Sequence, residues 1–168
     1  MQQINIAGIQ QIGIGVPDVK AAFRWYRQHF GMDVPVFEEA AEANLMLPYT
    51  GGQPHSRHAI LAINMKGGGG FEIWQYTSRT PQPPDFAPAA GDTGIFCARI
   101  KSTDVTETYR FMNEKKARVL GAPMADPGGQ TNFFLQDPWG NHFQVVPSSD
   151  WFPGKGYRNT ATETTRIH

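Results

Sequence analysis

The sequence predicts an α+β fold made of two tandem βαβββ modules. One reason is a repeat: residues 18–25 and 104–111 both begin with Asp-Val and then carry the order aromatic–arginine–aromatic at the same spacing. The second reason is the turn sequence Asp-Pro-Trp-Gly-Asn at 137–141, which leads into the alternating run 142–146. Proline presets φ in such a turn, and glycine and asparagine tolerate the left-handed conformation. Together these observations indicate a diverged duplication of one module.

The first module begins with a strand and a helix. Residues 9–16 are rich in β-forming residues with interleaved glycines, and Pro17-Asp18 ends the strand and supplies an N-cap. Apolar residues then recur at helical spacing up to Gly31, which suits a left-handed C-terminal position. They are Val19, Ala22, Phe23, Tyr26 and Phe30. One amphipathic helix is therefore expected at 19–30.

Strand-like runs complete the first module at 33–38, 44–49, 58–65 and 71–77. Lys66 and the glycines that follow it join the last two runs, which indicates a hairpin.

The proline-rich stretch 78–92 lacks periodicity and is expected to be an extended linker between modules. The second module is expected to have one helix among four strands, at 93–100, 104–116, 118–122, 131–136 and 141–146. The predicted modules therefore span 9–77 and 93–147, and a polar tail follows at 148–168.

Composition excludes several classes of protein. The 168 residues carry 15 basic and 15 acidic side chains, so no general attraction to nucleic acid or to an anionic membrane is expected. A single cysteine, Cys97, excludes an internal disulfide framework. The N-terminal residues do not have the pattern of a secretory signal, and no apolar run reaches membrane-spanning length. We therefore expect a cytoplasmic globular protein.

Two βαβββ modules with an Asp-Pro-x-Gly-Asn turn before the last strand resemble the vicinal oxygen chelate superfamily, which includes glyoxalase I, extradiol dioxygenases and bleomycin-binding proteins. The resemblance covers roughly residues 9–147, and the run 12–18 is similar to the opening strand of that family. It implies a curved, half-barrel mixed sheet around a central cup. It implies no single activity, because this fold carries isomerases, lyases, oxygenases and binding proteins.

The resemblance also implies four cup-facing positions that together hold a divalent metal. Carried over by position, they are Gln11, Glu72, Ile95 and Gln144. Divalent ions prefer carboxylate or imidazole ligands, and only Glu72 in this set is anionic. A catalytic metal usually needs three protein ligands. We therefore expect no metal cofactor.

His142 leaves one alternative open for a metal. It lies two residues before Gln144 and so shares its face of the strand, about 6 to 7 Å further along. A shifted site would then use Glu72 and His142, with Gln11 and Gln144 as neutral ligands. In the other interpretation, His142 packs at the end of the sheet or caps the turn.

Glu72 is the candidate catalytic residue in the cup. Trp74 and Tyr76 share its strand face, because side chains in a strand repeat with period 2. Two large aromatic neighbours are expected to desolvate the carboxylate and raise its pKa, which suits a general base. The alternative is a remnant whose carboxylate is satisfied by the amides of Gln11 and Gln144.

Two further residues are candidates for the substrate site. Cys97 is expected on the strand face of Ile95, where it is either a buried apolar group or a reactive thiol. Arg99, two residues further on, is either a rim residue that meets a ligand carboxylate or phosphate, or a solvated charge at the end of the strand.

Two functions follow from these residues. The first is a metal-independent isomerase or lyase that acts on a small carbonyl-bearing or aromatic molecule with Glu72 as general base. The second is a non-catalytic protein that sequesters a flat or hydrophobic small molecule between aromatic walls. The retained Glu72 favours the enzyme, and the missing metal ligands favour the binder.

A homodimer is expected because modules in this family often pair between or within chains. The tail carries the aromatic pair Trp151-Phe152, which is otherwise unexplained in a polar segment. Such a pair is expected to pack against the partner subunit or the rim of the cup.

Overall fold

The structure is a computed structural model that describes residues 9–66 and 69–148. Residues of the tail beyond 148, including Trp151 and Phe152, lie outside the described residues. Among those that are described, neither helix has the length and hydropathy to cross a membrane.

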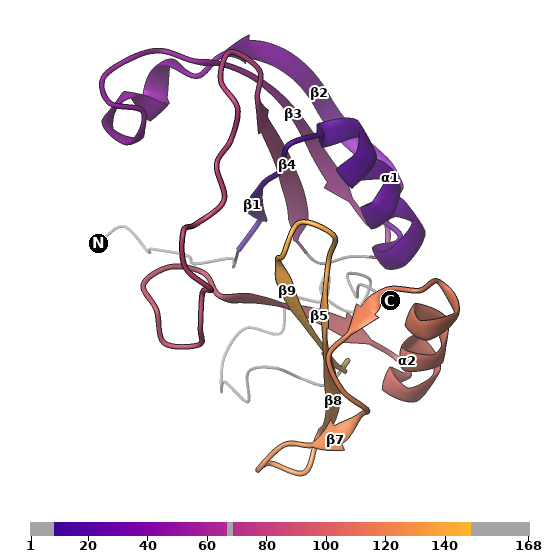
Figure 1. The fold of residues 1–168 in the computed structure, drawn as a ribbon. Helices are drawn as coiled ribbons and strands as arrows, with labels where there is room; N and C mark the ends of the chain where they lie inside the picture. The colour runs from indigo at the N-terminus through magenta and orange to yellow at the C-terminus, as the bar shows by residue number, and fades with distance from the viewer. Residues whose placement is uncertain (1–8, 67–68, 149–168) are drawn as a thin grey trace, which may run out of the picture.

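The first module contains one α-helix, one 3-10 helix and a four-stranded mixed sheet (Figure 1). Its elements are β1 (Gln11–Gly15), α1 (Val19–Phe30), β2 (Val34–Glu42), the 3-10 helix η1 (Asn44–Tyr49), β3 (Ser56–Ile63) and β4 (Gly70–Tyr76). The strand order is β1-β4-β3-β2, in which β1 and β4 are parallel and the other pairs are antiparallel. The strand order leaves β1 and β2 at the edges.

The second module repeats this plan with shorter outer strands. Its elements are β5 (Cys97–Ser102), α2 (Val105–Glu114), β6 (Arg118–Val119), β7 (Met124–Ala125), β8 (Thr131–Gln136) and β9 (His142–Pro147). The strand order is β5-β9-β8-β6, with β7 also paired to β8. The predicted α+β fold with two tandem modules is therefore confirmed.

The repeated Asp-Val segments begin both helices in the same way. Asp18 accepts a hydrogen bond from the backbone N–H of Ala21 at 2.9 Å, and Asp104 accepts one from Glu107 at 2.9 Å. Such side-chain caps satisfy donors that the first helical turn leaves unpaired. Gly31 ends α1 with φ of 62°, a left-handed conformation that glycine adopts without strain. The predicted bounds of α1 are confirmed.

Four predicted strands were wrong in their bounds or type, and the first of them, expected at 33–38, extends to Glu42. The run 44–49 is a 3-10 helix, because Pro48 has no N–H for a sheet ladder and β2 instead pairs with β3 as far as Glu42. The run 118–122 forms only the two-residue strand β6, and the short strand β7 was missed. The strand predicted from Thr93 begins at Cys97, since Gly94 has φ of 126°.

The two modules share one hydrophobic core on the helix side of their sheets. Tyr26 of α1 is fully buried, and its ring centroid lies 6.1 Å from that of Phe143 in β9. Phe30 lies 4.9 Å from Phe143. Figure 1 shows α1 and α2 on the same side of the molecule. The first helix therefore packs against a strand of the second module.

The distinctive turn at 137–141 also joins the modules. The Asp137 carboxylate is 3% exposed and accepts hydrogen bonds from the backbone N–H groups of Trp139 at 2.9 Å and Asn141 at 2.8 Å. Its second oxygen accepts from the Asn141 amide and from the Tyr26 hydroxyl. A buried carboxylate that accepts four hydrogen bonds holds the donating groups in fixed positions. The most recognisable motif of the chain is therefore structural.

Tyr26 makes the free energy of unfolding fall as the pH rises in the alkaline range. Burial, and then the negative charge of Asp137, raise the pKa of its hydroxyl above the ordinary value. The folded state therefore holds this proton at pH values where the unfolded chain loses it. Its contribution to stability is complete below about pH 10 and falls above it by up to about 1.4 kcal/mol per pH unit.

Alkaline titration measures this effect. We expect tyrosinate absorbance from Tyr26 to appear only as the protein unfolds, and Tyr26→Phe to show a shallower loss of stability above about pH 10. Complete ionisation of all five tyrosines in a protein that remains folded by circular dichroism would contradict this expectation.

Candidate functional site

The first sheet has one face against α1 and one face turned away from it. Ile14 and Ile73 lie in the core with Tyr26 of α1. Alternation along the strands places Gln11, Gly13, Glu72, Trp74 and their neighbours on the opposite face. We call this second face the open face. It carries the catalytic candidate.

Glu72 is half-buried on the open face and is held by Gln11. The Gln11 side-chain N–H donates to Oε2 of Glu72 at 2.6 Å. The contact follows from the parallel register of β1 and β4, in which Gly13 lies opposite Glu72 and Gln11 lies opposite Gly70. One carboxylate oxygen is therefore fixed by a neutral donor.

The aromatic residues predicted beside Glu72 lie on the same face. The rings of Trp74 and Tyr76 meet edge to face, with centroids 6.1 Å apart. Arg79 places its guanidinium carbon 4.8 Å from the Tyr76 centroid. Contacts of this kind hold aromatic side chains in one orientation.

Arg57 is a site residue that the sequence reasoning missed. Its guanidinium carbon lies 4.9 Å from the centroid of Trp74, and it forms an ion pair with Glu39 at 2.5 Å. The side chain is only 13% exposed, and its Nε has no hydrogen-bond partner among the described residues. The signal was present in the hairpin, because strand alternation puts Arg57 on the face of Tyr76 once β3 is paired with β4.

Bare backbone lies next to Glu72 and Trp74 on the open face. Gly13 pairs with Glu72, and Gly15 pairs with Trp74. A Cβ atom built on either glycine would meet no atom of the described residues within 4 Å outside its chain neighbours. The space above these two positions is therefore open to a ligand.

Ile95 is not part of the corresponding strand in the second module. It precedes β5 and is 78% exposed, so its predicted position was wrong. The helix caps set the true correspondence: Gln11 lies seven residues before Asp18, and Cys97 lies seven residues before Asp104. Cys97 is therefore the counterpart of Gln11.

Cys97 and Arg99 line up with His142 and Gln144 in the register of β5 and β9. Burial raises the pKa of the Cys97 thiol, and the charge of Arg99 offsets this only in part. A neutral thiol suits the interpretation of Cys97 as a half-buried apolar group. Arg99 is exposed.

Gln144 and His142 are occupied within their own module. The Gln144 amide is buried and donates to Oδ1 of Asn132 at 2.9 Å, so it does not supply the predicted hydrogen bond to Glu72. His142 stacks on Phe96 with ring centroids 4.8 Å apart, and its Nε2 lies 3.3 Å from Nε2 of Gln136. These contacts match the interpretation in which His142 packs at the end of the sheet.

The family's metal-binding positions do not fit a divalent ion in this chain. Within residues 9–66 and 69–148, no group of three His, Cys, Asp or Glu side chains is placed to hold one. Gln11 turns its N–H toward Glu72, because two oxygens would repel each other there. A metal bound to Glu72 would instead require the amide oxygen of Gln11. These positions therefore offer a divalent ion one carboxylate, Glu72, and no second anionic ligand.

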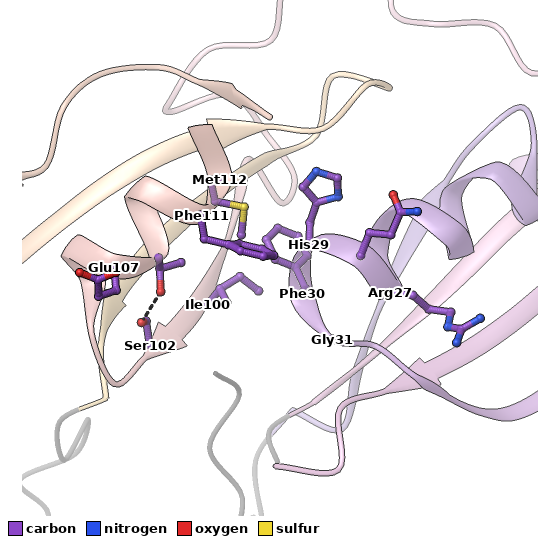
Figure 2. A pocket seen from close by; sticks show the side chains of 11 residues that line it. Arg27, His29, Phe30, Gly31, Ile100, Ser102, Glu107, Phe111 and Met112 are labelled. Atoms are coloured by element: carbon purple, nitrogen blue, oxygen red, sulfur yellow. Dashed lines mark hydrogen bonds between the residues drawn. The ribbon is translucent and has the colours of Figure 1, made fainter. Parts of the chain in front are cut away.

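A groove of about 430 Å³ lies on the helix side, away from Glu72. Figure 2 shows it between α1 and α2, with Phe30 and Ile100 at its centre and the hydrogen bond between the Ser102 and Thr108 hydroxyls at one side. His29 at its edge bonds the Trp25 carbonyl through Nδ1 at 2.8 Å. The groove marks the junction of the two modules.

Comparison with known protein families identifies the class of this chain. The model of the Glyoxalase/Bleomycin resistance protein/Dioxygenase superfamily matches residues 8–145. The chain belongs to this superfamily. No curated protein is similar enough to count as a relative.

Solved structures share the fold at low sequence identity. A glyoxalase family protein from Bacillus cereus has a TM-score of 0.68 and 11% identity, over 88% of this chain and 97% of its own. A glyoxalase family protein from Enterococcus faecalis has a TM-score of 0.62 and 18% identity, over 83% and 97%. A mutant glyoxalase I from Zea mays has a TM-score of 0.56 and 17% identity, over 84% of this chain and 46% of its own. These likenesses concern the fold alone.

Proposed function

We propose that the protein is a metal-independent isomerase or lyase that acts on a small carbonyl-bearing or aromatic molecule with Glu72 as general base. The observation that supports this most is the Gln11–Glu72 hydrogen bond, which orients a half-buried carboxylate beside open space. A base held by a second group is the usual arrangement for proton transfer.

The proposed chemistry uses the carboxylate oxygen of Glu72 that Gln11 does not bond. Gln11 occupies Oε2, so Oε1 takes the proton from a carbon next to the substrate carbonyl. The electrons of the broken C–H bond move into an enolate. In an isomerase Glu72 returns the proton to a carbon of the enolate; in a lyase the enolate expels a leaving group, and the proton passes to that group.

A second candidate function is sequestration of a flat molecule without turnover. The contacts of Trp74 with Arg57 and Tyr76 favour it, because they create a fixed aromatic wall that needs no catalytic group. This candidate predicts affinity without product.

The test begins with a screen and ends with one substitution. Thermal stabilisation by 2-oxo acids, acyl-CoA esters, glutathione hemithioacetals and aromatic natural products identifies ligands. Product formation from each hit is then compared between the wild-type protein and Glu72→Gln. Turnover that depends on Glu72 supports the enzyme, and binding without turnover supports sequestration.

We expect the purified protein to hold no stoichiometric transition metal, since the open face offers one carboxylate and a hydrogen-bonded amide. Elemental analysis after gel filtration measures this directly. About one equivalent of zinc, nickel, iron or manganese that survives mild chelation would overturn the expectation, and loss of that metal in His142→Ala would identify a shifted site.

The homodimer and the cytoplasmic location are part of this proposal and stay predictions.

A further inference from the structure

We propose that the open face takes a planar, fused-ring molecule that carries an O–H or N–H donor. Its ring lies over Gly13 and Gly15 against Trp74, and its donor points to Glu72. This inference rests on the site proposed above and names the class of molecule that the site accepts.

The backbone of β1 forms the floor of this subsite. Gly13 and Gly15 are both exposed, and in the part of the chain that the structure describes a Cβ atom at either position would meet nothing within 4 Å. Residues two apart on one strand face are about 6.6 to 6.8 Å from each other. Bare peptide groups over this length present a flat surface that suits two fused rings.

Trp74 forms the wall, and its orientation is fixed from the far side. The sheet order places β3, which carries Arg57, on the opposite side of β4 from β1. Arg57 contacts the indole at 4.9 Å, and Glu39 holds Arg57 in turn. The Nε of this arginine, whose side chain is 13% exposed, has no partner among the described residues, and leaving it unpaired costs free energy. This cost is explained if Arg57 serves to hold the indole of Trp74 in place for a ligand.

Glu72 closes one end of the subsite and sets its polarity. It lies opposite Gly13 in the register, while Trp74 lies opposite Gly15. A carboxylate accepts hydrogen bonds and donates none. The ligand therefore brings its donor to Oε2, which accepts from Gln11 and has a second lone pair, so that Oε1 stays available for the proton transfer proposed above. The ring of the ligand covers Gly15 beside the indole.

The experiment uses 2-naphthol as the probe and decahydro-2-naphthol as its non-planar counterpart. Titration of the isotope-labelled full-length protein is followed by the backbone amide signals of Gly13 and Gly15. We expect saturable shifts at these two amides with 2-naphthol, and binding weaker by at least about tenfold with the decahydro compound and with 2-methoxynaphthalene.

Variants that fill the floor provide the second measurement. Gly13→Val and Gly15→Val are each expected to weaken 2-naphthol binding by at least about tenfold. Their thermal stability should equal or exceed that of the wild type, because the added Cβ atoms meet none of the described residues and glycine is unfavourable in a strand. Gly121→Val is the matched control, since its Cβ also meets nothing but lies in the second module. Alanine variants serve if valine disturbs folding.

The outcomes separate this inference from the proposed function. Absence of shifts at both amides, equal binding of the planar and saturated probes, or unchanged binding in all the glycine variants would overturn it. Planar binding that depends on Gly13 and Gly15, with no Glu72-dependent turnover of any screened compound, would instead overturn the enzyme and keep the subsite.

Discussion

Replacement of Glu72 by glutamine is expected to lower kcat by about two to four orders of magnitude on any substrate that the screen identifies. Glutamine keeps the length and shape of the side chain, and its oxygen still accepts the hydrogen bond from Gln11. Only the ability to take a proton is lost. Ligand affinity should therefore change far less than turnover, so the loss appears in kcat rather than in KM.

The control for this experiment lies on the same sheet but on its other face. Glu38 of β2 bonds Lys20 and His58, away from the open face. Glu38→Gln should leave kcat within about twofold of the wild type, because it removes a surface ion pair. Undiminished turnover in Glu72→Gln would reject the general-base mechanism, whereas equal losses in both variants would indicate a general effect on folding.

Replacement of Asp137 by alanine is expected to destabilise the protein by about 3–5 kcal/mol. The substitution leaves the Tyr26 hydroxyl and the backbone N–H groups of Trp139 and Asn141 without their acceptor. Each unsatisfied buried group costs about 1–3 kcal/mol, partly offset by the removal of a buried charge. The free energy of unfolding in urea measures the loss.

Two milder variants test whether the tie between the modules is the cause. Tyr26→Phe removes one hydrogen bond to a charged acceptor and should cost about 1.5–3 kcal/mol. Asp137→Asn keeps an acceptor oxygen and should cost less than Asp137→Ala. A change below about 1 kcal/mol in Asp137→Ala would show that the turn holds its conformation without the carboxylate.

The elements with strong local signals were predictable from the sequence. The helix at 19–30 has an N-cap aspartate, regular apolar spacing and a terminal glycine, and each of these acts within one or two turns. The segment 44–49 had an equally apolar composition but formed a 3-10 helix. Its outcome depends on Pro48 and on how far the β2–β3 ladder extends, which local composition does not determine.

The site was predictable only where strand alternation sufficed. Glu72, Trp74 and Tyr76 share one face as expected, and Gln11 reaches Glu72 because the register of β1 and β4 is parallel. Arg57 belongs to the site because it lies opposite Tyr76 in the β3–β4 hairpin. A shift of two residues decides whether Ile95 or Cys97 is the counterpart of Gln11 in the second module. Register between strands is set by tertiary pairing, so pattern alone leaves such positions open.

The two faces of the first sheet make separate contacts, and this separation affects how the fold can vary. Phe71 of β4 meets Phe143 of the second module on the helix side, whereas its neighbour Glu72 and the exposed glycines of β1 face the other way. Alternate positions along one strand therefore differ in their contacts: one set packs into the core that joins the modules, and the other faces away from that core. Residues on the open face can therefore change without loss of core packing, which allows one architecture to carry many activities.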